Sequence, residues 1–111
     1  MNISKDDILK VNVGFEGNLR SGSSLDFALA MQKNRKIGEY KKVAYLLRAI
    51  LVDHPFSDGN KRTATFIVLK FAEDHKKQVN MDRLIHYLIS IAKKNIIEIK
   101  NIEWRIKNAI E

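Results

Sequence analysis

Apolar residues recur at the spacing of an α-helix along most of the chain, in runs separated by short polar or glycine-containing stretches. Alternating apolar and polar positions, which are typical of strands, are scarce, and only the stretch 96–99 is a candidate extended segment. The pattern therefore predicts an all-α fold. Its six expected helices run from Ser4 to about Val11, from Ser23 or Ser24 to about Met31, from Glu39 to Asp53, onward from Asn60, onward from Asn80, and onward from about Asn101.

The helix that begins at Asn60 differs from the others because it is apolar over much of its circumference, in Phe66–Leu69. We therefore expect it to be the central and most buried helix. Two other helix starts carry recognisable caps. Ser4 precedes an acidic first turn that contains Asp7, and Asn80 precedes a run whose apolar residues lie on one face.

The length of 111 residues is typical of one domain, so residues 1–111 are expected to form a single unit. The chain has no cysteine, which excludes disulfides and thiolate-bound metals. No apolar run approaches the roughly 20 residues that span a bilayer, and the polar start of the chain is unlike a signal peptide. We therefore expect a cytoplasmic protein without membrane contact.

The formal net charge of +7 is typical of proteins that bind nucleic acid, nucleotides or acidic partners. The basic residues, however, form short clusters spread along the chain, such as Lys41–Lys42 and Lys93–Lys94, which favours a generally charged surface. A helix-turn-helix joins its helices by a turn of about 3–4 residues, and the stretch between the two longest expected helices exceeds that. A basic helical nucleic-acid-binding module is therefore the less favoured alternative.

The stretch His54–Thr63, which joins those two helices and includes the start of the second, carries a dense set of functional groups. The ten residues include an imidazole, a carboxylate, a carboxamide, an ammonium and a guanidinium, which belong to His54, Asp58, Asn60, Lys61 and Arg62. Nucleotide chemistry needs a base, a hard ligand for a metal ion and groups that bind anions. The composition of this loop therefore indicates a nucleotide site.

The expected helix ends give each group a separate task. His54 lies at a helix C-terminus, where the dipole favours the protonated ring, and this suits a base that takes a proton from a hydroxyl. Gly59–Asn60 lie at the next helix N-terminus, where free N–H groups bind phosphate. Asp58 can offer an oxygen to Mg²⁺. Lys61–Arg62 lie in a first helical turn, which is unfavourable for cations unless an anion is bound there.

Structural alternatives remain open for several of these residues. Asp58 is also a good N-cap for the following helix. Phe56 is expected to be a structural anchor that holds the loop against the core, and Pro55 is expected to stop the preceding helix. The loop lacks the spacing and the preceding strand of a Walker A motif, which excludes that type of phosphate loop.

The stretch His54–Arg62 resembles the Fic/Doc family signature, His-x-Phe-x-Asp/Glu-Gly/Ala-Asn-x-Arg, with every defining position filled. The upstream segments Gly17–Arg20 and Leu25–Ala30 also resemble that family. The resemblance implies a single compact bundle of about six helices with the motif loop between two long central ones.

Family members that transfer AMP typically carry a second glycine where this chain has Lys61 and a second arginine where it has Thr65. Asn60–Ala64 instead resembles the death-on-curing (Doc) branch, although Gly59 occupies a position where that branch often has alanine. This similarity implies a toxin that transfers the γ-phosphate of ATP to a hydroxyl of a translation elongation factor. The alternative is a Fic-type AMP transferase acting on a protein hydroxyl.

The resemblance also implies roles for the loop residues. His54 would be the general base, Asp58 would bind Mg²⁺, and Gly59, Asn60, Lys61 and Arg62 would bind phosphate or hold the loop. The inhibitory Ser/Thr-x-x-x-Glu helix of self-inhibited relatives is not evident in the sequence. A separate antitoxin protein is therefore the expected partner, and it could fold onto this domain as an amphipathic segment.

Overall fold

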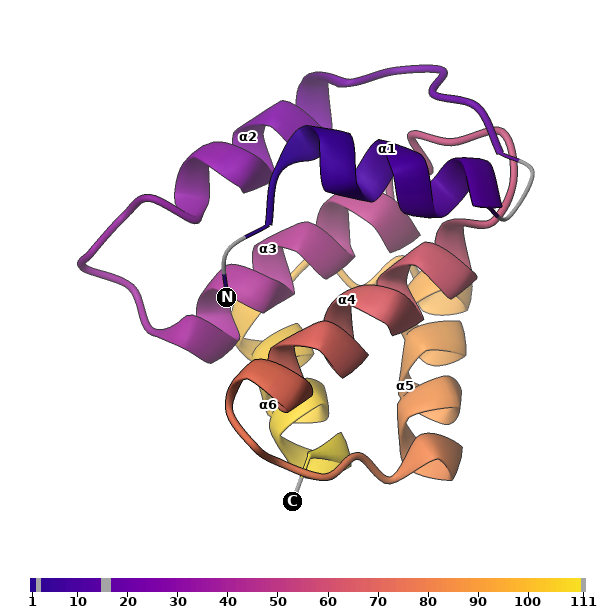
Figure 1. Ribbon diagram of the computed structural model, residues 1–111. Coiled ribbons are helices and arrows are strands. Elements are labelled where there is room, and N and C mark those ends of the chain that lie inside the picture. Colours follow the sequence, from indigo (N-terminus) through magenta and orange to yellow (C-terminus); the bar gives the residue numbers. More distant parts are fainter. Residues whose placement is uncertain (2, 15–16, 111) are drawn as a thin grey trace.

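The structure is a computed structural model that describes residues 1, 3–14 and 17–110. In these residues the fold consists of six helices. The helices are α1 (Lys5–Gly14), α2 (Ser23–Met31), α3 (Glu39–Leu51), α4 (Asn60–Asp74), α5 (Met81–Lys94) and α6 (Ile99–Ala109) (Figure 1). Within these residues no strand is present, and only two isolated bridges, Leu19–Phe56 and Val79–Ile110, pair extended segments. The prediction of an all-α fold with about six helices is confirmed.

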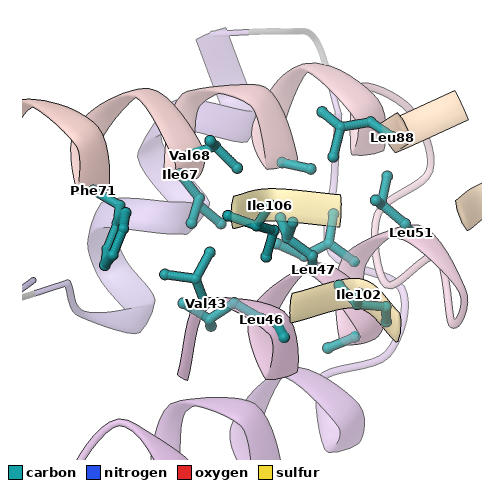
Figure 2. Close-up of a cluster of buried hydrophobic side chains, with 14 of the residues drawn as sticks. Val43, Leu46, Leu47, Leu51, Ile67, Val68, Phe71, Leu88, Ile102 and Ile106 are labelled. Atoms are coloured by element: carbon teal, nitrogen blue, oxygen red, sulfur yellow. The ribbon is translucent and has the colours of Figure 1, made fainter. Parts of the chain in front are cut away.

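The centre of the bundle is α3, which contacts α2, α4, α5 and α6. Its buried residues are Val43, Ala44, Leu46, Leu47, Ala49, Ile50 and Leu51. Figure 2 shows Val43, Leu46 and Leu47 in one cluster with side chains of α4 and α6. The prediction that the helix starting at Asn60 is the most buried is wrong. That helix buries Thr63, Ala64, Ile67, Val68, Phe71 and Ala72, whereas Leu69 is 39% exposed.

The last two helices pack on each other and on α3 through the residues that their periodicity predicts. Their buried apolar side chains are Leu84, Leu88, Ile91, Ile102, Ile106 and Ala109. Asn80 caps α5 as expected, since its Oδ1 accepts a hydrogen bond from the N–H of Arg83 at 3.1 Å. The last helix begins at Ile99, two residues before the expected start. Residues 96–98 belong to no helix and to no strand.

The first helix starts with a reciprocal cap. The N–H of Asp7 donates to Ser4 Oγ at 3.1 Å, and the N–H of Ser4 donates to Asp7 Oδ2 at 3.0 Å. Hydrogen bonds from Ser4, first that of its backbone N–H, hold the pKa of the Asp7 carboxyl below its ordinary value. This helix continues to Gly14, beyond the expected end at Val11.

Two further helix boundaries differ from the sequence expectation. The N-cap of α2 is Gly22, without a side-chain cap, so neither expected serine has that role. The α3 helix ends at Leu51, two residues before the expected end at Asp53. Both boundaries lie beside the segment that joins α3 to α4.

Among the described residues, no helix is long and apolar enough to cross a membrane.

Candidate functional site

The loop between α3 and α4 surrounds a hollow of about 300 Å³. We call residues 52–59 the motif loop, and the hollow with its lining the motif cleft. Its lining residues are His54, Ser57, Asp58, Gly59, Asn60, Lys61 and Arg62. The fold therefore brings together every polar residue that the sequence indicated as a site residue. Phe56 is absent from the cleft because it points into the core, where it is 1% exposed.

The N-terminus of α4 opens into this cleft without a side-chain cap. Gly59 occupies the N-cap position with φ of 73°, in the left-handed region that favours glycine. Asp58 is not the N-cap, since its Oδ1 accepts the N–H of Gly59 at 2.7 Å. The first N–H groups of a helix have no intrahelical partner. An uncapped helix start of this kind suits a phosphate group.

The side chain of Asn60 is used within the motif loop. Its Oδ1 accepts the N–H of Phe56 at 3.2 Å, and its Nδ2 donates to the carbonyl of Phe56 at 3.0 Å. This pair of bonds closes the loop from the first residue of α4 back to its buried phenylalanine. Of the two tasks open to Asn60, orienting a phosphate or orienting the loop, the geometry favours the loop.

His54 lies on the rim of the cleft with its side chain exposed. Its φ of 48° is unusual for a residue other than glycine, and its carbonyl accepts a hydrogen bond from Arg20 Nη2 at 2.9 Å. The helix α3 ends three residues earlier, at Leu51. His54 therefore lies outside the last turn of α3, and not at the end of that helix as the sequence predicted. The imidazole is instead accessible to a substrate.

A segment from the N-terminal part of the chain lies along the motif loop. The N–H of Ser57 donates to the carbonyl of Asn18 at 2.8 Å, and Leu19 forms a bridge with Phe56. The N–H of Arg20 donates to the carbonyl of Pro55 in the same short antiparallel contact. These contacts come from residues 18–20, which lie between α1 and α2. They hold the backbone of the motif loop from one side.

A buried polar network supports the cleft from beneath. Asn12 of α1 is 1% exposed, and its Nδ2 donates to the carbonyl of Asp58 at 2.9 Å and to Thr63 Oγ1 at 3.1 Å. The Thr63 hydroxyl in turn donates to the carbonyl of Gly59 at 2.8 Å. The backbone that presents Asp58 and Gly59 is therefore fixed from α1 and from α4.

Sequence reasoning missed this network, although one signal could have found it. Asn12 lies four residues after Ile8 on the face of the first helix that is buried in the structure. A carboxamide on a buried face must find hydrogen-bond partners. Gly17 belongs to the same arrangement, because a Cβ at that position would collide with Asn12 Oδ1 and with the carbonyl of Asp58.

The charges of the cleft suit an anionic ligand with a divalent cation. Lys61 and Arg62 are exposed in the first turn of α4, and neither forms an ion pair within residues 1, 3–14 and 17–110. The same residues contain no group of three or more His, Asp or Glu side chains that could enclose a metal. Asp58 alone offers a carboxylate here, which fits Mg²⁺ because that ion takes few protein ligands and the rest from phosphate and water.

The Fic/DOC family model matches residues 6–72. This span covers more than half of the chain and contains the whole motif loop, so the chain belongs to the Fic/DOC family. Members of this family are typically transferases. The match does not distinguish the branches of the family, and it ends before α5 and α6. The search of curated proteins and the search of solved structures each gave no match.

Proposed function

We propose that this Fic/DOC protein is a Doc-like toxin that transfers the γ-phosphate of ATP to a hydroxyl of a translation elongation factor. The observation that carries the proposal is the uncapped start of α4, opened by left-handed Gly59, with His54 and Asp58 on the same cleft. A helix start suited to phosphate, a carboxylate that would bind a metal ion and a histidine that would act as the base on a second substrate thus line one cleft. Phosphoryl transfer relies mainly on such positioning and on electrostatic stabilisation.

The nucleotide would lie with its phosphates at the start of α4. Backbone N–H groups of the first turn and the side chains of Lys61 and Arg62 would neutralise phosphate charge. Asp58 would hold Mg²⁺, which supplies positive charge to the transferring phosphate. Asn60 would act indirectly, by keeping the loop in shape through its two bonds to Phe56.

His54 would act on the acceptor. Its imidazole takes the proton of the target hydroxyl while the hydroxyl oxygen bonds to the γ-phosphorus. At the same time the bond between the γ-phosphorus and the oxygen that links it to the β-phosphorus breaks. The products are a phosphorylated hydroxyl, ADP and a proton carried away from the imidazole. The exposed position of His54 allows a protein substrate to reach it.

Two residues favour phosphate over AMP as the transferred group. Lys61 and Thr65 stand where AMP-transferring relatives typically have glycine and arginine. Thr65 cannot replace a cation, and its hydroxyl donates to the carbonyl of Lys61 at 2.8 Å within α4. Gly59 instead favours AMP transfer, because the Doc branch often has alanine at this position. AMP transfer to a protein hydroxyl is therefore the second candidate.

The partners follow from the same proposal. The target would be a translation elongation factor, and an antitoxin protein would restrain the enzyme. A net charge of +7 would favour association with an acidic antitoxin, since opposite charge accelerates encounter. Both reactants of the proposed transfer occur in the cytoplasm.

Isotope labelling tests the proposal. The purified protein is incubated with Mg²⁺, an elongation factor from the expression host and ATP labelled at either the α or the γ position. Label that reaches the elongation factor from the γ position, and not from the α position, is the expected result. Label from the α position would replace phosphate transfer by AMP transfer, and no label from either position would refute both reactions on this target. His54→Ala serves as the inactive control.

A further inference from the structure

A second hollow of about 300 Å³ lies between the N-terminal part of α2 and the C-terminal part of α3. These two helices pack against each other, and the chain enters α2 directly after the segment that pairs with the motif loop (Figure 1). Asp53 lines this hollow, and the next residue, His54, lines the motif cleft. The linings of the two hollows therefore meet at consecutive residues of the chain, and the proposed base follows directly after a residue of the second hollow.

The wall of the second hollow contains two aromatic rings and an arginine that contact one another. The rings of Phe27 and Tyr45 meet edge to face with centroids 6.0 Å apart. The guanidinium of Arg48 lies 5.2 Å from the centroid of Tyr45, and Arg48 Nη1 donates to the carbonyl of Ile97 at 3.3 Å. These contacts hold Tyr45 and Arg48 in place. Phe27 is only partly covered by them and remains 52% exposed.

The residue types of this wall are those that bind proteins. Exposed aromatic and arginine side chains dominate the energy of protein interfaces, particularly when they line a pocket. Ser23, Ser24 and Asp53 add hydroxyl and carboxylate groups to the lining, which can bond to the backbone of an extended peptide. A nucleotide phosphate suits this hollow poorly, because the Asp53 carboxylate offsets the charge of Arg48.

We propose that this hollow, which we call the acceptor pocket, binds an apolar side chain of the protein substrate, with aromatic side chains preferred. This inference rests on the proposed function, since it concerns how the protein substrate is presented to His54. A side chain held beside Asp53 would place a neighbouring hydroxyl of the same segment next to the imidazole. Phe27, Tyr45 and Arg48 would thus select the target segment, while the motif cleft holds the phosphate donor.

A peptide array tests the pocket without any transfer reaction. The purified wild-type protein is incubated with arrayed degenerate nine-residue peptides, and bound protein is detected at each spot. Enrichment of aromatic or long aliphatic residues at one peptide position is expected for the wild type. The enrichment is expected to disappear in Phe27→Ala and to persist in Ile89→Ala, which truncates a similarly exposed apolar side chain on α5. Absence of enrichment in the wild type, or its persistence in Phe27→Ala, overturns the proposal.

Transfer kinetics give the second readout. In the γ-label assay with the elongation factor, Phe27→Ala is expected to raise KM for the protein substrate about tenfold or more while leaving KM for ATP unchanged. Ile89→Ala is expected to change neither. A lower kcat with an unchanged protein KM would contradict a binding role for Phe27. Failure of the wild type to transfer label refutes the proposed function, and the array result still decides whether the pocket binds peptide.

Discussion

The motif loop and the layer formed by α5 and α6 are held by different forces. In the loop, single side chains such as Asn60 and Asn12 fix the backbone through hydrogen bonds of about 3 Å. In the layer, apolar side chains at helical spacing, including Leu88 and Ile102, are buried against α3. The loop exposes its functional groups, whereas the layer hides its main side chains. The proposed chemistry and most of the stability would therefore depend on different parts of the chain.

This division has a consequence for substitutions. Changes in the motif loop should affect reaction and ligand binding more than stability, because the functional side chains of the loop are exposed. Changes in the α5–α6 layer should affect stability more than reaction, because its buried side chains lie outside the lining of the motif cleft. A change at Asn12 should affect both stability and reaction, because its side chain is buried and also donates a hydrogen bond to the motif loop.

The largest expected effect is that of His54→Ala. Transfer of γ-label to the elongation factor should fall by a factor of about 10²–10⁴, because a general base contributes that much. The midpoint of thermal unfolding should stay the same, since the side chain is exposed. His86→Ala on α5, also exposed, is the matched control and should leave transfer unchanged. Undiminished transfer by His54→Ala would refute the role of the base.

The next effect is on stability. Ile102→Ala removes a fully buried side chain of α6 and should lower the free energy of unfolding by about 2–5 kcal/mol. Denaturant titration measures this change. The transfer rate per folded molecule should be unchanged at a temperature where the variant is folded. A loss of kcat without a loss of stability would show that the α5–α6 layer takes part in the reaction.

Asn12→Ala should produce both effects at a smaller size. The carbonyl of Asp58 and the Thr63 hydroxyl lose their shared donor, so the free energy of unfolding should fall by about 1–3 kcal/mol. The less rigid backbone at Asp58 and Gly59 should also weaken the binding of Mg²⁺–ATP, which calorimetry measures. Asn101→Ala, which removes an exposed carboxamide from α6, is the control for both measurements. Unchanged nucleotide binding in folded Asn12→Ala would limit the network to a structural role.

The smallest effect concerns the cap of α1 and depends on pH. The pKa of the Asp7 carboxyl is lowered in the folded state by the hydrogen bonds from Ser4, so its ionised form stabilises the fold above its ordinary pKa. That contribution is lost as the pH falls through the lowered pKa. Asp7→Asn should therefore lower the thermal midpoint slightly near neutral pH, and this difference from the wild type should shrink in strong acid. A difference independent of pH would contradict the role of the charge.

Most of the fold could be predicted because helix periodicity is a local property of the sequence. The caps at Ser4 and Asn80 and the buried faces of α5 and α6 follow from residues a few positions apart. The central position of α3 could not be predicted this way. Whether a helix is central depends on how many other helices pack against it. The apolar circumference of α4 had instead suggested that α4 is the central helix.

The candidate site residues could be named from the sequence, but the hydrogen bonds that support the candidate site could not. The polar residues of His54–Arg62 gather in one cleft because they are neighbours in the chain. The bond from Asn12 to Thr63 joins residues 51 positions apart, so only the tertiary structure reveals it. The α3 helix ends at Leu51, shortly before the turn in which His54 has a φ of 48°, and local helix propensity did not show this early end.

The most direct test of the division between loop and layer is a map of backbone amide chemical shifts during titration with Mg²⁺–ATP. The account predicts the largest shifts at residues 57–62, where the N–H groups at the start of α4 would meet phosphate, and almost none at 81–109. The Asn12→Ala variant should show smaller shifts at the same amides. Shifts concentrated in α5 and α6, or a motif loop that does not respond to the nucleotide, would contradict the account.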